Sequence, residues 1–231
     1  MSASRDTGHQ LATVSLFEHL SPAVLDELSR SSLVRHYPQG QILCNEGDPG
    51  ESLIVLESGS LRVSRLLASG DEAVLAVMDA PSALGELALL DGAPRDATVT
   101  AQRDVTVRLI PRMVFMDVLR REPAAMEGLL RALAALVRHG NARHADMIGL
   151  DVPGRLAKWL LRQAGGSGDG EIAAGAVVAL RSSQGELAAE LGTTRSTLNR
   201  ALRGFESLGL IAVDGTQVTV LEPNRLRSYT W

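Results

Sequence analysis

The sequence is poor in residues and segments on which several classes of protein depend. Cys44 is the only cysteine among 231 residues, which excludes a disulfide within the chain and a cysteine-ligated iron–sulfur cluster. No apolar run reaches the roughly 20 residues that a membrane-spanning helix needs, and the start, MSASRDTGHQ, lacks the apolar segment of a signal peptide. We therefore expect a cytoplasmic protein with no membrane contact, a flexible arm over 1–15, and Cys44 packed in a strand.

The net charge of −4 by itself disfavours a polyanionic partner, but the charges are unevenly distributed. Up to residue 150 there are 14 basic and 19 acidic side chains, whereas the rest of the chain has 9 basic and 8 acidic ones. Between Thr193 and Gly204 there are three arginines and no acid. Nucleic-acid binding depends on such a local patch more than on the total charge.

The first half of the chain reads mainly as β-structure. Ser21 and Pro22 precede a short amphipathic stretch, which predicts a helix ending near Arg30. From Leu33 to Pro111, short β-rich runs alternate with turn-forming residues, which indicates a compact antiparallel barrel or jelly roll. One apolar, helix-forming stretch, Glu86 to Leu90, interrupts them. The runs are LVRHY, SLIVLES, SLRVSRLL, AVLAVM, ATVTAQ and VTVRLI.

A long helix is predicted from Pro123 to Leu150. Seven positions recur at alternating steps of four and three, the spacing that keeps one seam facing a partner helix. The pattern favours a symmetric dimer contact, with an ordinary long core helix as the alternative. The predicted seam consists of Met126, Leu130, Leu133, Val137, Gly140, His144 and Met147.

The last third of the chain has the pattern of a winged helix-turn-helix. An amphipathic helix starts after Asp151, and a loop, GGSGDGEIAAG, follows it. A helix from about Ser183 to Glu190 meets a turn at Gly192, and Thr194 can cap a second helix that ends near Ser207. The β-like run LIAVDGTQVTVL, turning at Asp214 and Gly215, completes the motif.

The second helix of this motif has one polar and one apolar face. At about 100° per residue, Arg195, Ser196, Asn199, Arg200 and Arg203 share one side, and Leu198, Ala201, Leu202 and Phe205 share the other. An arginine-rich face suits the major groove, where arginine binds guanine O6 and N7; a solvated charged face is the alternative. The predicted DNA-binding residues are Ser183, Gln184, Thr194, Arg195, Ser196, Asn199, Arg200 and Arg203.

Two separated motifs carry a resemblance to a known family. YPQGQILCNEGDPGESLIVLESGSLRV and LGELALLDGAPRDATVTA resemble the cyclic-nucleotide-binding domain, and from Leu16 onward the chain resembles the CRP/FNR (catabolite-activator) family of bacterial transcription regulators. The resemblance implies an α+β fold with an N-terminal antiparallel β jelly roll as sensor (16–122), a dimerisation helix (123–150) and a C-terminal winged helix-turn-helix (151–231). It also implies a homodimeric transcription regulator that binds a palindromic site on double-stranded DNA and has RNA polymerase as a partner.

The second motif predicts an effector pocket. Gly85 opens a short helix whose backbone N–H groups favour an anion, and Arg95 can bind a phosphate with paired charge-assisted hydrogen bonds. In relatives that bind cyclic nucleotides, the residue matching Glu86 accepts from the ribose hydroxyl and the one matching Arg95 holds the phosphate. The alternative is that Glu86 only favours a helix start and that Arg95 makes an internal ion pair. The predicted effector-binding residues are Gly85, Glu86, Leu87, Arg95, Asp96 and Asn141.

Two residues depart from the pattern of cAMP-binding relatives. Asp96 stands where they usually have a Ser or Thr donor, and an ionised carboxylate has no proton to donate. Gly140 and Asn141 stand where relatives use Thr and Ser to contact the purine across the dimer. The pocket is therefore expected to take a cyclic nucleotide or another small effector, with cAMP disfavoured by Asp96 and Gly140. Alternatively, Asp96 pairs with Arg95 and closes the pocket, which would make a ligand-independent regulator.

The reading helix departs from the family at one position, and nothing in the sequence points to catalysis. Arg195 and Arg200 match the family pattern, but Ser196 replaces its glutamate, so we expect a different base preference. Glu86, Arg95 and Asp96 form no nucleophile–base pair, and the sequence has no metal-binding constellation. The alternative from another functional class is a cyclic-nucleotide-binding regulatory subunit that controls a protein partner.

Overall fold

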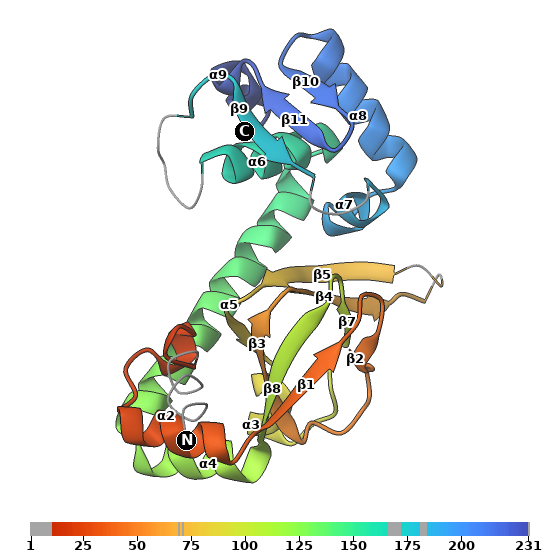
Figure 1. Cartoon of the computed structure of the whole chain (residues 1–231). Helices are drawn as coiled ribbons and strands as arrows, with labels where there is room; N and C mark the ends of the chain where they lie inside the picture. The colour runs from red at the N-terminus through yellow and green to blue at the C-terminus, as the bar shows by residue number, and fades with distance from the viewer. Residues whose placement is uncertain (1–10, 69, 71, 166–171, 181–183, 231) are drawn as a thin grey trace. The chain divides into compact units, whose positions relative to one another are not determined.

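The structure of the chain is a computed structural model that describes residues 11–68, 70, 72–165, 172–180 and 184–230 (Figure 1). The chain forms two compact units, Met1–Arg138 and His139–Trp231. Within the described ranges, no helix is long and apolar enough to span a membrane.

Two four-stranded antiparallel sheets form the first unit. Their strand orders are β1-β8-β3-β6 and β2-β7-β4-β5, so the chain passes repeatedly from one sheet to the other. This arrangement confirms the predicted jelly roll. The strands are β1 (Leu33–Tyr37), β2 (Ile42–Cys44), β3 (Ser52–Ser58), β4 (Ser60–Leu66), β5 (Glu72–Asp79), β6 (Ser82–Leu84), β7 (Thr98–Ala101) and β8 (Val105–Pro111).

Strand β3 lies between two hydrophobic clusters, which explains its nearly continuous apolar run. Because side chains alternate across a strand, Ile54 and Leu56 join one cluster with Leu61, Val99 and other strand residues. Leu53 and Val55 point the other way and pack with residues of the helices. A strand buried on both faces needs no polar alternation.

Helices cover the second face of β3. They are η1 (Ser15–Phe17), α2 (Pro22–Arg30), α3 (Glu86–Asp91) and α4 (Arg112–Arg121). The sequence predicted α2 and α3 but missed α4, which follows Pro111 without a side-chain cap. It also missed the three-residue strands β2 and β6, although Cys44 lies in β2 and packs against the strand cluster as predicted.

The prediction of a flexible arm over 1–15 is wrong from Leu11 onward. Leu11 and Val14 are buried in the helix-side cluster with Phe17. They pack there because both are apolar and lie against the buried side chains of the helices. Residues 1–10 lie outside the described residues.

Arg108 forms a buried ion pair within one sheet and also bonds the turn that follows α2. Arg108 Nε on β8 donates to Glu57 Oε1 on β3 at 2.6 Å, and the two side chains are 3% and 7% exposed. The Nη1 of Arg108 also donates to Ser32 Oγ, 3.0 Å away in the turn that follows α2. The guanidinium is thus bonded on two sides, which a buried charge requires.

One long helix, α5 (Pro123–Gly149), contains residues of both units. Ala125, Gly128 and Leu129 in its first turns are buried in the first unit. Gly128 approaches the backbone of Leu16 so closely that a Cβ there would clash with the Leu16 carbonyl oxygen. After Leu133 the helix has no fully buried residue.

The second unit is a winged helix-turn-helix, as predicted. Its elements are α6 (Val152–Gly165), β9 (Ala176–Ala179), α7 (Gln184–Glu190), α8 (Arg195–Ser207), β10 (Ile211–Asp214), β11 (Gln217–Val220), α9 (Pro223–Arg227) and η2 (Ser228–Thr230). The three strands form an antiparallel sheet in the order β10-β11-β9. The sequence missed β9 and α9.

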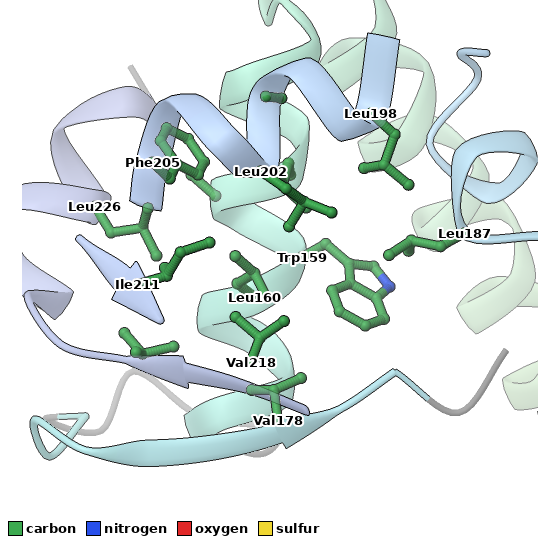
Figure 2. Packing of buried hydrophobic residues seen from close by; sticks show 14 of the residues in the cluster. Trp159, Leu160, Val178, Leu187, Leu198, Leu202, Phe205, Ile211, Val218 and Leu226 are labelled. Carbon is green, nitrogen blue, oxygen red and sulfur yellow. The ribbon is translucent and has the colours of Figure 1, made fainter. Parts of the chain in front are cut away.

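The core of this unit fixes the orientation of α8. Figure 2 shows Leu202 of α8 pointing toward Leu160 of α6 and Leu198 pointing toward Leu187 of α7; Phe205 belongs to the same cluster. These side chains are almost fully buried. Because the apolar side of α8 is fixed in this way, its opposite side must face solvent.

Candidate functional site

The predicted effector pocket begins at Gly85, the residue before α3. Gly85 has a φ of +91°, a left-handed conformation that favours glycine. A Cβ at this position would also overlap the Nη1 of Arg95. The backbone conformation therefore favours glycine, and a side chain at this position would oblige the end of the Arg95 side chain to shift.

Arg95 is hydrogen-bonded to the backbone at two places. Its Nη1 donates to Gly85 O at 3.0 Å, and its Nη2 donates to Ser52 O. The side chain is only 6% exposed, and its buried Nε has no hydrogen-bond partner among the described residues. A buried donor without a partner is costly, and an anionic ligand atom would satisfy it.

The expected ion pairs of Arg95 are not formed. No ion pair among the described residues includes Arg95, so the internal ion pair and the Arg95–Asp96 closure that the sequence left open are both absent from that part of the chain. The guanidinium instead donates to the backbone carbonyls of Gly85 and Ser52. Asp96 itself is exposed.

The candidate site includes two carboxylates, and one of them, Asp96, affects the other, Glu86. Burial raises the pKa of Glu86, and the nearby Asp96 charge raises this pKa further. Arg95 and the backbone N–H groups of Glu86 and Gly85 act in the opposite direction, but burial is the largest effect. Leu87 is partly exposed beside them. The site therefore combines one buried cation with a carboxyl group whose pKa is raised by burial.

Asn141, the last predicted effector residue, lies on α5 in the second unit and is exposed. Its neighbour Gly140 has open space around it, with nothing within 4 Å of an added Cβ. The role of Asn141 in effector binding stays a prediction.

The polar face of α8 is arranged as the sequence predicted. Arg195, Ser196, Arg200 and Arg203 are exposed and Asn199 is half-buried, whereas the apolar face is buried. None of the ion pairs found in the described ranges engages these three arginines. They are therefore available for phosphates or base edges.

The start of α8 is capped as predicted. The Thr194 Oγ1 accepts from Thr197 N at 3.3 Å, which satisfies one free N–H of the first turn. Thr194 Oγ1 also lies 3.0 Å from Ser196 Oγ. Gln184 is half-buried at the start of α7, and Ser183 lies outside the described residues.

Two arginines that sequence reasoning missed contact the turn between α7 and α8. Arg143 of α5 donates to Glu190 O at 2.7 Å, and Arg155 of α6 donates to Leu191 O at 2.9 Å. Their partners are backbone carbonyls, which no residue pattern marks. A single sequence therefore offered no means of finding these contacts.

The predicted dimer seam is largely solvent-exposed. Met126, Leu130 and Val137 are 40%, 59% and 60% exposed, and Met147 is also exposed. Leu133 is partly buried because it packs against the helix-side cluster. Gly140 and His144 are exposed as well. A stripe of exposed apolar side chains on one helix is costly in water.

Comparisons with known proteins match both units. Residues 34–122 match the cyclic nucleotide-binding domain, and residues 154–229 match the Crp-like helix-turn-helix domain. The chain is 33% identical over 217 residues to a "CRP-like cAMP-activated global transcriptional regulator" of Mycobacterium tuberculosis. The matched region covers 94% of this chain and 96% of the relative.

Two further comparisons agree with this result. The chain is 28% identical to the "Cyclic AMP receptor protein" of Thermus thermophilus, over 90% of this chain and 92% of that protein. The structure of FixK2 from Bradyrhizobium japonicum superposes with a TM-score of 0.74 at 22% identity, over 87% of this chain and 98% of that one. At that identity the similarity shows a shared fold.

Proposed function

The chain belongs to the CRP/FNR family of transcription regulators, and from this premise we propose that it acts as a homodimer on a palindromic DNA site, controlled by its β-roll pocket. It is a DNA-binding regulator with a sensor domain, in a family of regulators and not of enzymes. The observation that carries the proposal is the face of α8, where Arg195, Arg200 and Arg203 are exposed above a buried apolar side.

The exposed stripe on α5 supports the homodimer. Pairing two copies of the seam would remove Leu130, Val137 and their neighbours from water, at about 25 cal/mol for each Å² of apolar surface buried. A second copy is the partner that fits, because the four-three spacing of the seam matches the same spacing on an identical helix. Two α8 helices related by this symmetry would recognise inverted repeats.

The effector that suits the pocket is a small molecule with an anionic group. The unpartnered Nε of Arg95 supports this choice, since a phosphate oxygen could accept from it. The exposed carboxylate of Asp96 opposes a second negative charge nearby. We therefore propose a cyclic nucleotide or a similar small anion, with cAMP disfavoured by Asp96 and Gly140.

Control would work by a shift of populations. An effector changes DNA binding only if it binds the DNA-competent conformation more tightly than the other one. In this protein the two conformations would differ in the pairing of the α5 helices and in the pose of the two α8 helices. RNA polymerase is a further proposed partner, and a cytoplasmic location stays a prediction.

The alternative, a regulatory subunit that controls a protein partner, is set aside. The segment that would have to contact such a partner is the one that matches the Crp-like helix-turn-helix. The exposed arginines of α8 are also suited to a nucleic acid, because their fork of donors matches base edges and phosphates.

Selection of DNA sites from a random pool by the purified full-length protein tests the proposal. We expect enrichment of inverted half-sites whose centres lie about 34–36 Å apart, one helical turn. Arg200→Ala should abolish the enrichment, whereas Arg225→Ala, the same charge change on α9, should preserve it. Enrichment of single, unrepeated sites, or none by the wild type, would overturn the proposal.

A further inference from the structure

Four backbone carbonyl groups at the end of α7, those of residues 188–191, each accept a hydrogen bond. Gly192 adopts a φ of +63°, and its N–H donates to Ala189 O at 3.1 Å. The N–H of Thr193 donates to Ala188 O at 2.8 Å. This is a Schellman motif, which satisfies two of the carbonyls that a helix leaves free at its C-terminal end. The carbonyls of Glu190 and Leu191 remain for other partners.

Two arginines from outside the motif take these remaining carbonyls. Arg143 Nη2 donates to Glu190 O at 2.7 Å, and Arg155 Nε donates to Leu191 O at 2.9 Å. Cations are favourable at this end of a helix, because the helix dipole is negative there. Burial lowers the pKa of Arg143, consistent with a guanidinium packed against the turn and not extended into solvent.

Met147 adds an apolar contact on the same turn. A Cβ on Gly192 would overlap the Met147 methyl group and lie 2.9 Å from its Sδ. Residues 143 and 147 are four apart, so both lie on one face of α5. Asp146 of the same helix accepts from Lys158 Nζ of α6 at 2.5 Å.

Arg155 and Arg143 differ in what they connect. Arg155 also donates to Leu150 O at 2.7 Å, and it belongs to α6, whose apolar face forms the core of the same unit. Arg143 belongs to α5, the helix that also carries the proposed dimer seam. A change in the position of α5 would therefore act on the turn through Arg143 and Met147, while Arg155 keeps the turn attached to α6.

We propose that Arg143 and Met147 are positioning residues that connect the dimerisation helix to the recognition helix. They hold the turn that ends two residues before the first helical residue of α8 and so set the pose of Arg195, Arg200 and Arg203. This inference rests on the proposed function and adds to it the residues that couple the two helices.

Loss of the Arg143 hydrogen bond should change the orientation of α8 without unfolding the unit. Without the Arg143 bond the turn keeps its Schellman motif, its Arg155 bond and its buried core, so the unit should remain folded. The recognition helix α8 would sample more orientations relative to α5. The two α8 helices of a dimer would therefore be oriented for simultaneous binding of both half-sites in a smaller fraction of molecules. Apparent affinity falls in proportion to the fraction of competent conformations.

The experiment compares specific and non-specific DNA binding by full-length variants on the selected palindrome and on a scrambled duplex. We expect Arg143→Ala to lower the affinity for the palindrome about tenfold or more, the equivalent of one charged hydrogen bond. The affinity for the scrambled duplex and the melting temperature should stay close to wild type. Arg143→Lys, which can still donate to Glu190 O, should restore most of the loss.

Two further variants separate the effect of the orientation of α8 from the effect of losing a positive charge. Arg138→Ala removes the same charge from an exposed position on α5 and should leave the ratio of specific to non-specific affinity unchanged. Met147→Ala changes no charge and should lower that ratio, with the dimer mass checked in the same samples because Met147 also belongs to the predicted seam.

The inference is overturned if Arg143→Ala binds the palindrome like wild type, if it loses specific and non-specific binding equally, or if it fails to fold. If the wild type itself selects no palindrome, the proposed function fails instead, and the two failures are thus distinguishable.

Discussion

The guanidinium of Arg95 lies directly against the backbone of Gly85. The Nη1 of Arg95 donates to the Gly85 carbonyl at 3.0 Å and occupies the space where any side chain at position 85 would begin. A Cβ at Gly85 would therefore oblige the Arg95 guanidinium to shift from this position. A change at either residue should affect the other.

Gly85→Ala should destabilise the protein more than Gly92→Ala. Both glycines flank α3 with a positive φ, so alanine at either position is strained by about 1–2 kcal/mol. Only at Gly85 would the methyl group also displace Arg95, since Gly92 has open space around it. Urea unfolding of the two variants measures the difference. Equal losses would mean that Arg95 moves aside without cost.

Removing the charge of Asp96 should increase the affinity for a cyclic nucleotide. Two like charges 4 Å apart repel by about 1 kcal/mol in water and about 4 kcal/mol at an effective dielectric of 20, so the gain lies between roughly fivefold and a thousandfold. Calorimetric titration with cAMP, cGMP and cyclic dinucleotides tests wild type, Asp96→Ser and Asp96→Asn. Asp96→Asn separates the charge from the hydroxyl donor, and a wild type that binds as tightly as both variants would refute this role for Asp96.

The raised pKa of Glu86 should make stability depend on pH. Burial, with Asp96 in addition, raises this pKa above its unfolded value, so the folded state binds more protons between the two values. The free energy of unfolding should therefore fall as pH rises from the ordinary glutamate pKa, about 4.3, to the raised value. Glu86→Gln should remove this fall, as measured by urea unfolding at a series of pH values. Asp96→Asn should narrow the pH range over which the free energy of unfolding falls, because it removes one cause of the raised Glu86 pKa. A wild type and Glu86→Gln with parallel pH profiles would contradict the prediction.

Val137→Glu should convert the dimer to a monomer. Val137 is 60% exposed on the seam, and two glutamates facing each other across a symmetric contact would repel and lose their hydration. Light scattering after gel filtration should give about 24.5 kDa for the variant and twice that for wild type. Arg138→Glu adds a carboxylate one residue off the seam and should remain dimeric. A wild type of 24.5 kDa would disprove the seam.

Ser196→Glu should change the DNA sequence that the protein selects. Serine contacts bases with little discrimination, whereas glutamate accepts from cytosine N4. We expect the selected palindrome to gain a preference at one position in each half-site, worth about 1–3 kcal/mol against the wrong base. Arg203→Ala, at the far end of the same face, should not create that preference. An unchanged site for Ser196→Glu would show that position 196 does not contact bases.

Local patterns accounted for most of the fold. The strands β1, β3 and β8 were predictable because apolar runs end at turn residues, and α8 was predictable because Thr194 caps a helix with two distinct faces. Strands β2 and β6 were not, because three residues carry too little pattern. Helix α4 lacks a side-chain cap, which removed the usual signal for its start.

The candidate sites were less predictable because their contacts are long-range. The motif marked Arg95, but its partners are carbonyls of Gly85 and Ser52, and Ser52 is 43 residues away. The polar face of α8 follows from helical periodicity alone. Arg143 and Arg155 carry no local signal, since any backbone carbonyl could accept from them and only the tertiary fold decides which one does.

The Arg108–Glu57 pair has a consequence for how this sequence can diverge. Removing one partner leaves a buried charge alone, at a cost of about 3–5 kcal/mol, whereas replacing both with apolar residues of similar volume is often neutral. Either single substitution therefore produces a less stable protein, whereas the double substitution does not. Descendants of this sequence should keep both residues or lose both together, and the attachment of α2 to the sheet, through Ser32, should change in the same event.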